Sequence, residues 1–173
     1  MAGIADLDRA VIVAIGGNLS GPFATPEALL EAALARFAGV GLPILARSRW
    51  WRSAAWPDAA QPAYRNAVVI VDTTALPEAV LATLIRLEAE LGRIRTTPNA
   101  PRTLDLDLIA HGRTVIDSDG LTLPHPRAHT RRFVMGPLAE IAPEWVHPRL
   151  GKSAKSLAAM ANVGRDAAPV HAP

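Results

Sequence analysis

The sequence contains no cysteine, which excludes disulfide bonds, thiolate catalysis and zinc sites built on cysteine. It also lacks any apolar run of membrane-spanning length and any Gly-x-Gly-x-x-Gly or Gly-Lys-Ser/Thr phosphate loop. Its first residues carry acids and have no basic lead before a long apolar stretch, unlike a secretory signal. We therefore expect a cytoplasmic protein with no membrane partner.

The composition is that of a globular protein that binds a local anion. Half of the 173 residues are hydrophobic and a fifth are charged, which suits one domain of ordinary size. Arginine greatly outnumbers lysine without forming a long basic block, which favours a phosphate ligand over a nucleic-acid track. We expect a flexible arm at 1–8, one folded domain at 9–163 and a disordered tail at 164–173.

The order of apolar patterns predicts the fold class. Buried or alternating runs predict strands, and capped amphipathic runs that open with proline predict helices. The expected order is a strand at 11–15, a helix from 26, a strand at 44–52, a strand at 64–72, a helix from 77 and a strand from 103. This β-α-β-β-α-β order predicts an α+β, ferredoxin-like fold, with an antiparallel sheet, packed helices and a C-terminal hairpin and helix extension.

The strand from Thr103 carries the most informative polar pair. Asp105 and Asp107 alternate with leucines, so both carboxylates face one side of the strand while the leucines face the other. Residues at i and i+2 lie roughly 7 Å apart at their Cα atoms. Such a pair can hold one hard divalent cation or help to bridge two, with Arg102 adding a positive charge nearby. The ordinary alternative is a half-buried strand whose polar face is simply solvated.

Other polar residues surround this strand in a fixed order, and it is their joint order that carries information. The set is Gly16-x-Asn18-Leu19, Tyr64-x-Asn66, Glu88, Gly92-Arg93-x-Arg95, Pro101-Arg102-Thr103-Leu104-Asp105-Leu106-Asp107, Pro124-His125 and Arg131-x-Phe133. In order and spacing it resembles the 6-hydroxymethyl-dihydropterin pyrophosphokinases, a family of folate biosynthesis, from about Val11 to Ala159. Each motif alone would be an ordinary turn, helix end or core position.

The resemblance implies a reaction and its catalytic residues. Members of the family transfer the diphosphate of ATP to the hydroxymethyl group of 6-hydroxymethyl-7,8-dihydropterin and release AMP. By that resemblance, Asp105 and Asp107 would bind two Mg²⁺ ions, and Arg93 and Arg102 would stabilise the transferring group. A guanidinium fork matches phosphate oxygens well.

The resemblance also implies two sets of substrate contacts. The ATP contacts would be Glu88, Arg95, Arg102, Thr122, His125 and Arg131. The pterin contacts would be Ser53, Ala54, Trp56, Tyr64, Asn66 and Phe133. An asparagine amide pairs a donor with an acceptor and so can read the amide-like edge of a pterin, while a phenyl ring can stack on its flat face.

The sequence departs from the better-known members of that family at several places, among them a loop between Arg95 and Arg102 that is one residue shorter and Ile85 where they have a glutamine. Asn99 lies where they carry a tryptophan that closes over the site, and Gly120 stands where they have an arginine that touches the nucleotide. Ser53-Ala54-Ala55 replaces a Thr-Pro-Pro-like stretch, and the following Trp56 is a candidate for the missing aromatic. These changes concern loop closure and ATP affinity more than the reaction.

Two other interpretations fit parts of the sequence. Nucleotide-sugar transferases also use Asp-x-Asp, but this chain is short for them and its element order does not suit their parallel sheets. RNA-recognition domains share the ferredoxin-like order, yet two acids stand here where a phosphate backbone would lie. We therefore expect a monomer that binds two small molecules, ATP and the pterin, and no nucleic acid.

Overall fold

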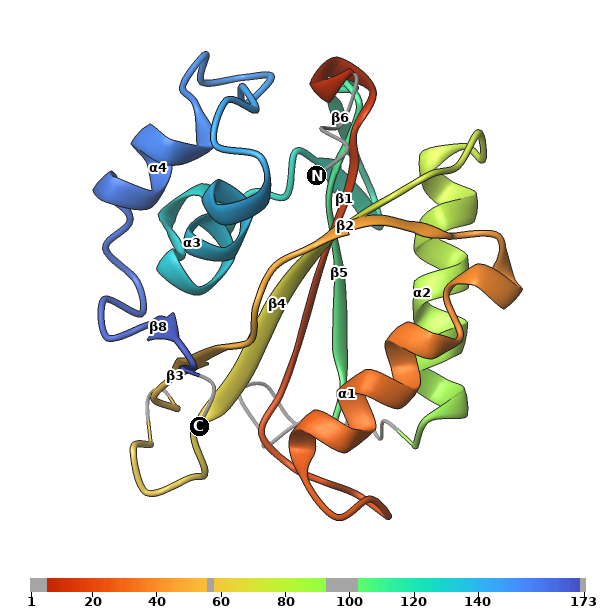
Figure 1. Ribbon diagram of the computed structural model, residues 1–173. Coiled ribbons are helices and arrows are strands. Elements are labelled where there is room, and N and C mark those ends of the chain that lie inside the picture. The colour runs from red at the N-terminus through yellow and green to blue at the C-terminus, as the bar shows by residue number, and fades with distance from the viewer. Residues whose placement is uncertain (1–5, 56–57, 93–102, 172–173) are drawn as a thin grey trace.

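A sheet lies between two layers of helices (Figure 1). The computed structural model describes residues 6–55, 58–92 and 103–171. Helices α1 (Pro26–Ala35) and α2 (Pro77–Glu90) cover one face of the sheet. Helices α3 (Arg132–Ile141) and α4 (Ala154–Met160) cover the other. Each face of the sheet is therefore packed against its own pair of helices.

The main sheet has the strand order β5-β1-β4-β3-β8 within the described residues, and β2 also pairs with β4. Every pairing in it is antiparallel. A separate hairpin joins β6 to β7. The strands are β1 Val11–Gly17, β2 Ile44–Arg47, β3 Trp51–Ser53, β4 Tyr64–Val71, β5 Asp105–His111, β6 Ile116–Ser118, β7 Leu121–Leu123 and β8 Ala168–Pro169, and the 3-10 helices are η1 Leu7–Arg9, η2 Ala38–Val40 and η3 Ala128–Thr130.

Alternation along the strands divides the core into two clusters, one on each face of the sheet. Val13 of β1 and Leu106 of β5 pack in the cluster with α1 and α2. Ile12 and Ile109 pack in the cluster with α3 and α4. Because side chains alternate along a strand, Asp105 and Asp107 lie on the face covered by α3 and α4. The predicted ferredoxin-like α+β fold is confirmed.

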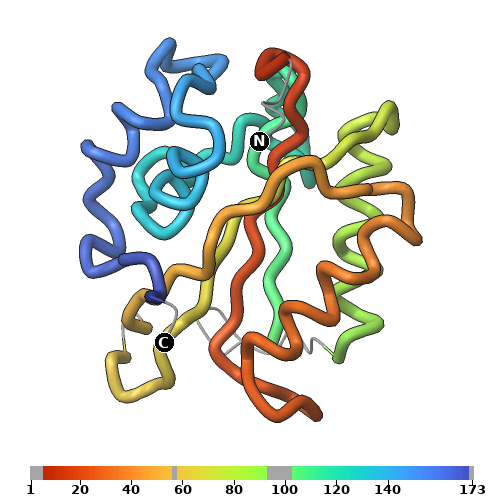
Figure 2. The backbone as a smooth tube through the Cα atoms, viewed as in Figure 1, coloured from red at the N-terminus to blue at the C-terminus, as the bar shows by residue number. Residues whose placement is uncertain are grey.

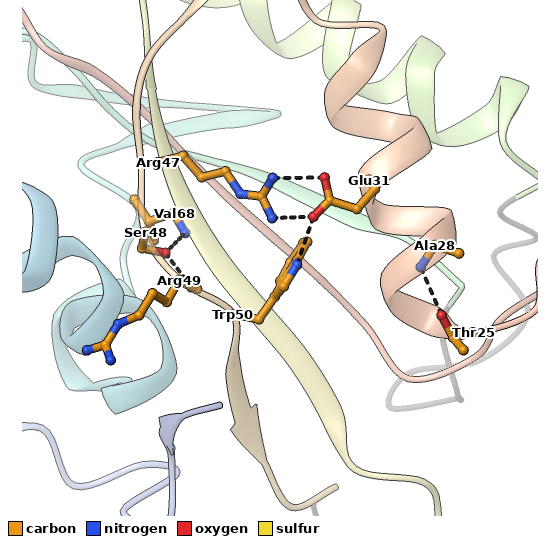
Figure 3. A network of polar contacts seen from close by, with 8 residues as sticks. All are labelled: Thr25, Ala28, Glu31, Arg47, Ser48, Arg49, Trp50 and Val68. Atoms are coloured by element: carbon orange, nitrogen blue, oxygen red, sulfur yellow. Dashed lines mark hydrogen bonds and ion pairs between the residues drawn. The ribbon is translucent and has the colours of Figure 1, made fainter. Parts of the chain in front are cut away.

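The predicted start of α1 is also confirmed. The Thr25 hydroxyl accepts a hydrogen bond from the Ala28 amide at 3.1 Å (Figure 3), and Pro26 occupies the first helical turn. An N-cap of this kind satisfies one of the amides that a helix leaves without an internal partner. The apolar stripe that follows is buried: Leu29, Leu30, Ala33, Leu34 and Phe37.

The predicted strand at 44–52 is instead two strands. The chain leaves the ladder between β2 and β3, at Ser48 to Trp50. The Ser48 hydroxyl accepts from the Val68 amide at 3.0 Å and donates to the Arg49 carbonyl at 2.9 Å (Figure 3). The side chain thus replaces a ladder contact to β4 where the backbone turns away, which apolar periodicity alone does not reveal.

The prediction of a disordered tail at 164–173 is wrong for residues 164–171. Residues 168–169 form β8, which pairs with β3, and the Val170 amide donates to the Trp50 carbonyl at 2.8 Å. A strand of two residues in an alanine- and proline-rich segment has no periodic signal. Of the arm predicted at 1–8, Leu7 and Asp8 belong to η1, which Asp6 caps, and residues 1–5 lie outside the described residues.

The contact between α3 and β3 depends on Gly136. A Cβ atom at Gly136 would lie 2.5 Å from Cη2 of Trp51, so the indole packs directly on the helix backbone. We predict that Gly136→Ala lowers the free energy of unfolding by about 1–3 kcal/mol, the usual cost of overpacking a core. Gly39→Ala is the matched control, because nothing lies within 4 Å of its added methyl group. Urea unfolding of both variants checks this, and equal stabilities would contradict it.

Candidate active site

The register of three strands brings the two halves of the predicted site together. Gly16 of β1 pairs with Asn66 of β4 on one side and with Asp105 of β5 on the other. Side chains of directly paired residues share a face of the sheet, and neighbouring strands lie about 4.8 Å apart. Asn66 and Asp105 therefore stand on one face, roughly 10 Å apart at their Cα atoms.

Gly16 leaves space for the Asn66 side chain. A Cβ atom at Gly16 would lie 2.9 Å from Oδ1 of Asn66 and 3.3 Å from the Arg65 carbonyl oxygen. The Asn66 amide thus lies over the glycine backbone, where any side chain would displace it. Its Nδ2 donates to Oγ of Ser53 at 2.9 Å, and both residues are buried. Asn66 is held in one orientation by its neighbours on β1 and β3.

Asn18 continues this ordered end of the sheet. It is 1% exposed, and its Nδ2 donates to the Pro62 carbonyl at 3.0 Å. The contact joins the end of β1 to the loop that precedes β4. Tyr64 opens β4 and pairs with Ser53, so the tyrosine lies beside the Asn66–Ser53 contact. The predicted pterin residues Ser53, Tyr64 and Asn66 therefore lie together.

A carboxylate of α2 fixes the strand that carries the aspartates. Glu88 is 3% exposed, and its Oε1 accepts a hydrogen bond from the Leu106 amide at 2.7 Å. Leu106 lies between Asp105 and Asp107, so the bond holds the β5 backbone between the two residues that carry the carboxylates. In this structure Glu88 supports the aspartates from inside the fold.

The two aspartates suit a magnesium ion that is shared with a phosphate. Both are half-buried on one face of β5, and carboxylate oxygens are the hard donors that Mg²⁺ prefers. In the described ranges no group of three or more acidic or histidine side chains could enclose a metal ion. The pair would therefore supply part of the coordination and leave the rest to substrate oxygens and water.

His125 lies in a mixed electrostatic environment next to β5. Its amide donates to the Ile109 carbonyl at 2.8 Å, which places it beside the strand of the aspartates. The pKa of His125 is lowered to about 4, mainly by burial and also by the charges of Arg131 and Arg127, which Asp105 opposes. His125 is therefore neutral near pH 7.

The hydrogen bonds of His125 also indicate its tautomer. Nδ1 accepts from the Arg127 amide at 3.2 Å, so the single proton of the neutral ring is assigned to Nε2. A neutral imidazole with a proton on Nε2 is a hydrogen-bond donor. His125 can donate to a phosphate oxygen but brings no positive charge to it.

Arg131 and Phe133 meet at the start of α3. The guanidinium carbon of Arg131 lies 5.7 Å from the centre of the Phe133 ring, a cation–π arrangement. Phe133 is half-buried. Thr122 lies on β7 between two buried leucines, in the hairpin that packs beside β5. All three residues come from the part of the chain that follows β5.

The chain that leads to Ser53 is held by a carboxylate of α1. Glu31 accepts from both terminal nitrogens of Arg47 and from Nε1 of Trp50 at 2.9 Å (Figure 3). The guanidinium of Arg47 also lies 4.7 Å from the centre of the Trp50 ring. The hydrogen bond from Arg47 is the main reason why the pKa of Glu31 is lowered.

A carboxylate of α3 holds the same segment from the opposite face of the sheet. Glu140 accepts from the Arg49 amide at 2.9 Å, from Nε of Arg49 at 3.0 Å and from Nε1 of Trp51 at 3.0 Å. Burial alone would raise the pKa of Glu140, but the hydrogen bonds from Arg49 and Trp51 outweigh it and lower the pKa. Two adjacent tryptophans are thus fixed by helices on opposite faces.

The structure brings together most of the described residues that the sequence singles out. Asp105 and Arg131 both lie within electrostatic reach of His125, and Phe133 lies under the Arg131 guanidinium. Ser53, Tyr64 and Asn66 lie together on β3 and β4. Arg93, Arg95, Arg102, Trp56 and Asn99 lie outside the described residues. The sequence reasoning missed Asp166, whose carboxylate accepts from the Ala54 amide at 2.6 Å. No motif marks it, because the contact spans 112 residues.

Similarity to known proteins gives the site a context. A model of the protein family described as 7,8-dihydro-6-hydroxymethylpterin-pyrophosphokinase matches residues 12–143. A 2-amino-4-hydroxy-6-hydroxymethyldihydropteridine pyrophosphokinase of Synechocystis is 43% identical over 143 residues, covering 82% of this chain and 71% of that protein. The protein of the same name from Haemophilus influenzae is 37% identical over 137 residues, covering 79% and 83%.

Solved structures support the same fold. The crystal structure of wild-type Plasmodium falciparum HPPK-DHPS with STZ-DHP matches 87% of this chain, with a TM-score of 0.70 and 12% sequence identity. That likeness concerns the fold alone. The chain spans 42% of the Plasmodium chain, and 20% of a folic acid synthesis protein from Pneumocystis carinii to which it is 36% identical.

Two histidines with lowered pKa values, the half-buried His125 and the buried His147, make the stability depend on pH. His147 is 4% exposed, and burial, followed by His129 and Arg149, lowers its pKa to about 4, like that of His125. Below the ordinary value of 6.5, the unfolded chain binds protons at these residues that the folded chain does not. The contribution of these two histidines to the free energy of unfolding is therefore fully present above pH 6.5 and is lost as the pH falls toward 4.

We predict that the free energy of unfolding, measured with urea, decreases from pH 7 to pH 5.5. His147→Gln removes one of the two groups, so the decrease should be smaller in that variant even if its stability at pH 7 differs. A wild-type stability that is constant over this range, or an equal decrease in the variant, would contradict the assignment.

Proposed function

The chain belongs to the 7,8-dihydro-6-hydroxymethylpterin-pyrophosphokinase family, and we propose that its two substrates are ATP and 6-hydroxymethyl-7,8-dihydropterin. It is a pyrophosphokinase of folate biosynthesis. In the proposed reaction the diphosphate of ATP passes to the hydroxymethyl oxygen and AMP is released. One observation supports the proposal: Gly16 of β1 pairs with Asp105 of β5 on one side and with the buried Asn66 of β4 on the other, so a carboxylate suited to metal and an amide lie on one face of the sheet.

The pterin would bind at the β3–β4 side of this face. Asn66 presents a donor and an acceptor that match the amide-like edge of the ring, and Ser53 orients it. Phe133 would stack on the ring from the start of α3, while Tyr64 and the backbone of Ala54 complete the wall. The same role is proposed for Trp56. Because Asn66 is buried, a ligand without a matching donor and acceptor would leave the polar atoms of its amide without hydrogen bonds, which favours the pterin over other ligands.

ATP would bind at the β5 side. Asp105 and Asp107 would hold two Mg²⁺ ions together with the phosphates, and Glu88 keeps their strand in place. When bound, the ions would neutralise triphosphate charge and lower the pKa of the attacking hydroxyl. Arg93, Arg95 and Arg102 are proposed phosphate ligands on the grounds of their order in the chain. Direct nucleotide contacts of Glu88 and Thr122 stay predictions.

His125 and Arg131 would act on the phosphates in different ways. Nε2 of the neutral His125 ring would donate a hydrogen bond to a phosphate oxygen, and Arg131 would supply fixed positive charge. Asp105 lies within electrostatic reach of His125, so both groups serve the same end of the nucleotide. Arg131 would thus supply the positive charge at this end of the nucleotide, and the neutral His125 would supply a hydrogen-bond donor.

The chemistry needs little covalent help from the protein. The hydroxymethyl oxygen would attack the β-phosphorus of ATP, and the bond from that phosphorus to the oxygen bridging to the α-phosphate would break. AMP leaves with the bridging oxygen, and the hydroxyl proton passes to solvent. The protein's part is to hold both substrates in line and to stabilise charge, which are the main sources of rate enhancement in phosphoryl transfer.

The expected cellular context is a further part of the proposal. We predict that the chain acts as a monomer in the cytoplasm on small molecules and not on nucleic acid. Across the residues that the structure describes, no helix is both long and apolar enough to cross a membrane.

We predict that Asp105→Asn or Asp107→Asn lowers the rate of AMP formation by on the order of 10²-fold or more, because charge stabilisation of the transferred group is lost. The assay mixes protein, ATP, Mg²⁺ and 6-hydroxymethyl-7,8-dihydropterin and measures AMP. Asp119→Asn is the control, since Asp119 is an exposed acid in the β6–β7 turn. No AMP from the unaltered protein, or full activity in both site variants, would refute the proposal.

We also predict that Asn66→Ala weakens pterin binding by about tenfold, the cost of losing one or two buried hydrogen bonds, and weakens ATP binding far less. Equilibrium titration with each ligand measures the two effects separately. An equal loss for both ligands would show that Asn66 supports the fold of the site and does not recognise the pterin.

A further inference from the structure

The C-terminal segment 163–170 lies against the proposed pterin side of the site. Ala168 pairs with Arg52, and Pro169 with Trp51, so β8 is the neighbour of β3. β8 runs beside β3 in the backbone trace (Figure 2). This segment follows the 12–143 range that matches the family model.

Asp166 contacts the backbone at the point where β3 ends. The last pair between β3 and β4 is Ser53 with Tyr64, so the ladder does not fix Ala54. The Ala54 amide donates to Oδ2 of Asp166 at 2.6 Å. The Ala54 side chain is a methyl group and cannot hydrogen-bond to fix this exposed backbone. The Asp166 carboxylate accepts the amide hydrogen bond that a paired strand would otherwise accept.

The same segment also supports Phe133. A Cβ atom at Gly164 would lie 2.5 Å from Cδ1 of Phe133, so the ring packs directly on this glycine, whose φ of +67° favours glycine in any case. The neighbouring Arg132 donates its amide to the Val163 carbonyl at 2.8 Å and its Nε to the Ala167 carbonyl at 3.2 Å. The segment is thus fixed to the start of α3.

We propose that Asp166 is a positioning residue for the pterin, acting through the Ala54 amide. The proposal rests on the proposed function, because Ala54 and Phe133 are proposed to contact the pterin. Segment 163–170 contacts both of them, through Asp166 and Gly164. Gly164 and Asp166 lie two residues apart, so the Phe133 ring and the Ala54 backbone share one support. Loss of the carboxylate frees the Ala54 wall and leaves the metal-binding strand β5 unchanged. Asp166 does not touch the substrate itself.

The test compares Asp166→Ala and Asp166→Asn with the unaltered chain. Pterin binding is measured at equilibrium by the fluorescence of 6-hydroxymethylpterin with a non-hydrolysable ATP analogue present, and AMP release gives kcat and both KM values. We expect Asp166→Ala to raise the Kd and KM for pterin about fivefold, with kcat and the KM for ATP within twofold. Asp166→Asn should recover part of the loss, because its amide oxygen still accepts. Arg165→Ala, an exposed neighbour, should match the unaltered chain.

Each other outcome has a definite meaning. Pterin binding by Asp166→Ala within twofold of the unaltered chain would overturn the positioning role. Equal losses for pterin and ATP, together with a lower urea midpoint, would also overturn it and show a general structural role. If the unaltered chain binds pterin but forms no AMP, the proposed function fails while the ratio of the Kd values still decides the role of Asp166. If the unaltered chain binds no pterin, both proposals fail.

Discussion

The antiparallel register of β5, β1 and β4 determines where the other groups of the site can lie. Gly16 stands between Asp105 and Asn66, and it has no side chain to separate them. A one-residue shift of β5 or of β4 against β1 would move Asp105 or Asn66 to the face that α1 and α2 cover, into an apolar cluster. The burial of alternate residues in two separate clusters therefore fixes the register and, with it, the spacing of the two substrate subsites.

Each polar group on this face is held by a residue from another element. Glu88 of α2 holds the amide between the aspartates, and Ser53 of β3 holds Asn66. Glu31 and Glu140 fix the chain before Ser53 from opposite sides of the sheet, and Asp166 fixes the chain after it. A site that must align two substrates needs such support, because a small displacement of a reacting group reduces the rate strongly. The carboxylates outside the site thus serve its geometry.

The strands and their faces could be predicted because alternation has a period of two and the core is apolar on both sides of the sheet. The face of Asp105 and Asp107 follows from the leucines around them, and the grouping with Asn66 and His125 from the order of motifs. Three features could not be predicted: the break at Ser48, the burial of Glu88 and the ordered tail at Asp166. Each depends on a polar contact with a residue distant in sequence, which leaves no periodic trace.

The most direct measurement is a crystal structure with Mn²⁺ in place of Mg²⁺, a non-hydrolysable ATP analogue and the pterin, with anomalous scattering recorded at the manganese edge. Two anomalous peaks should lie between the carboxylates of Asp105 and Asp107 and the phosphates, with the pterin edge on Asn66 across Gly16. Manganese bound away from these aspartates, or a pterin bound elsewhere than beside Asn66, would contradict a site organised by the β5-β1-β4 register.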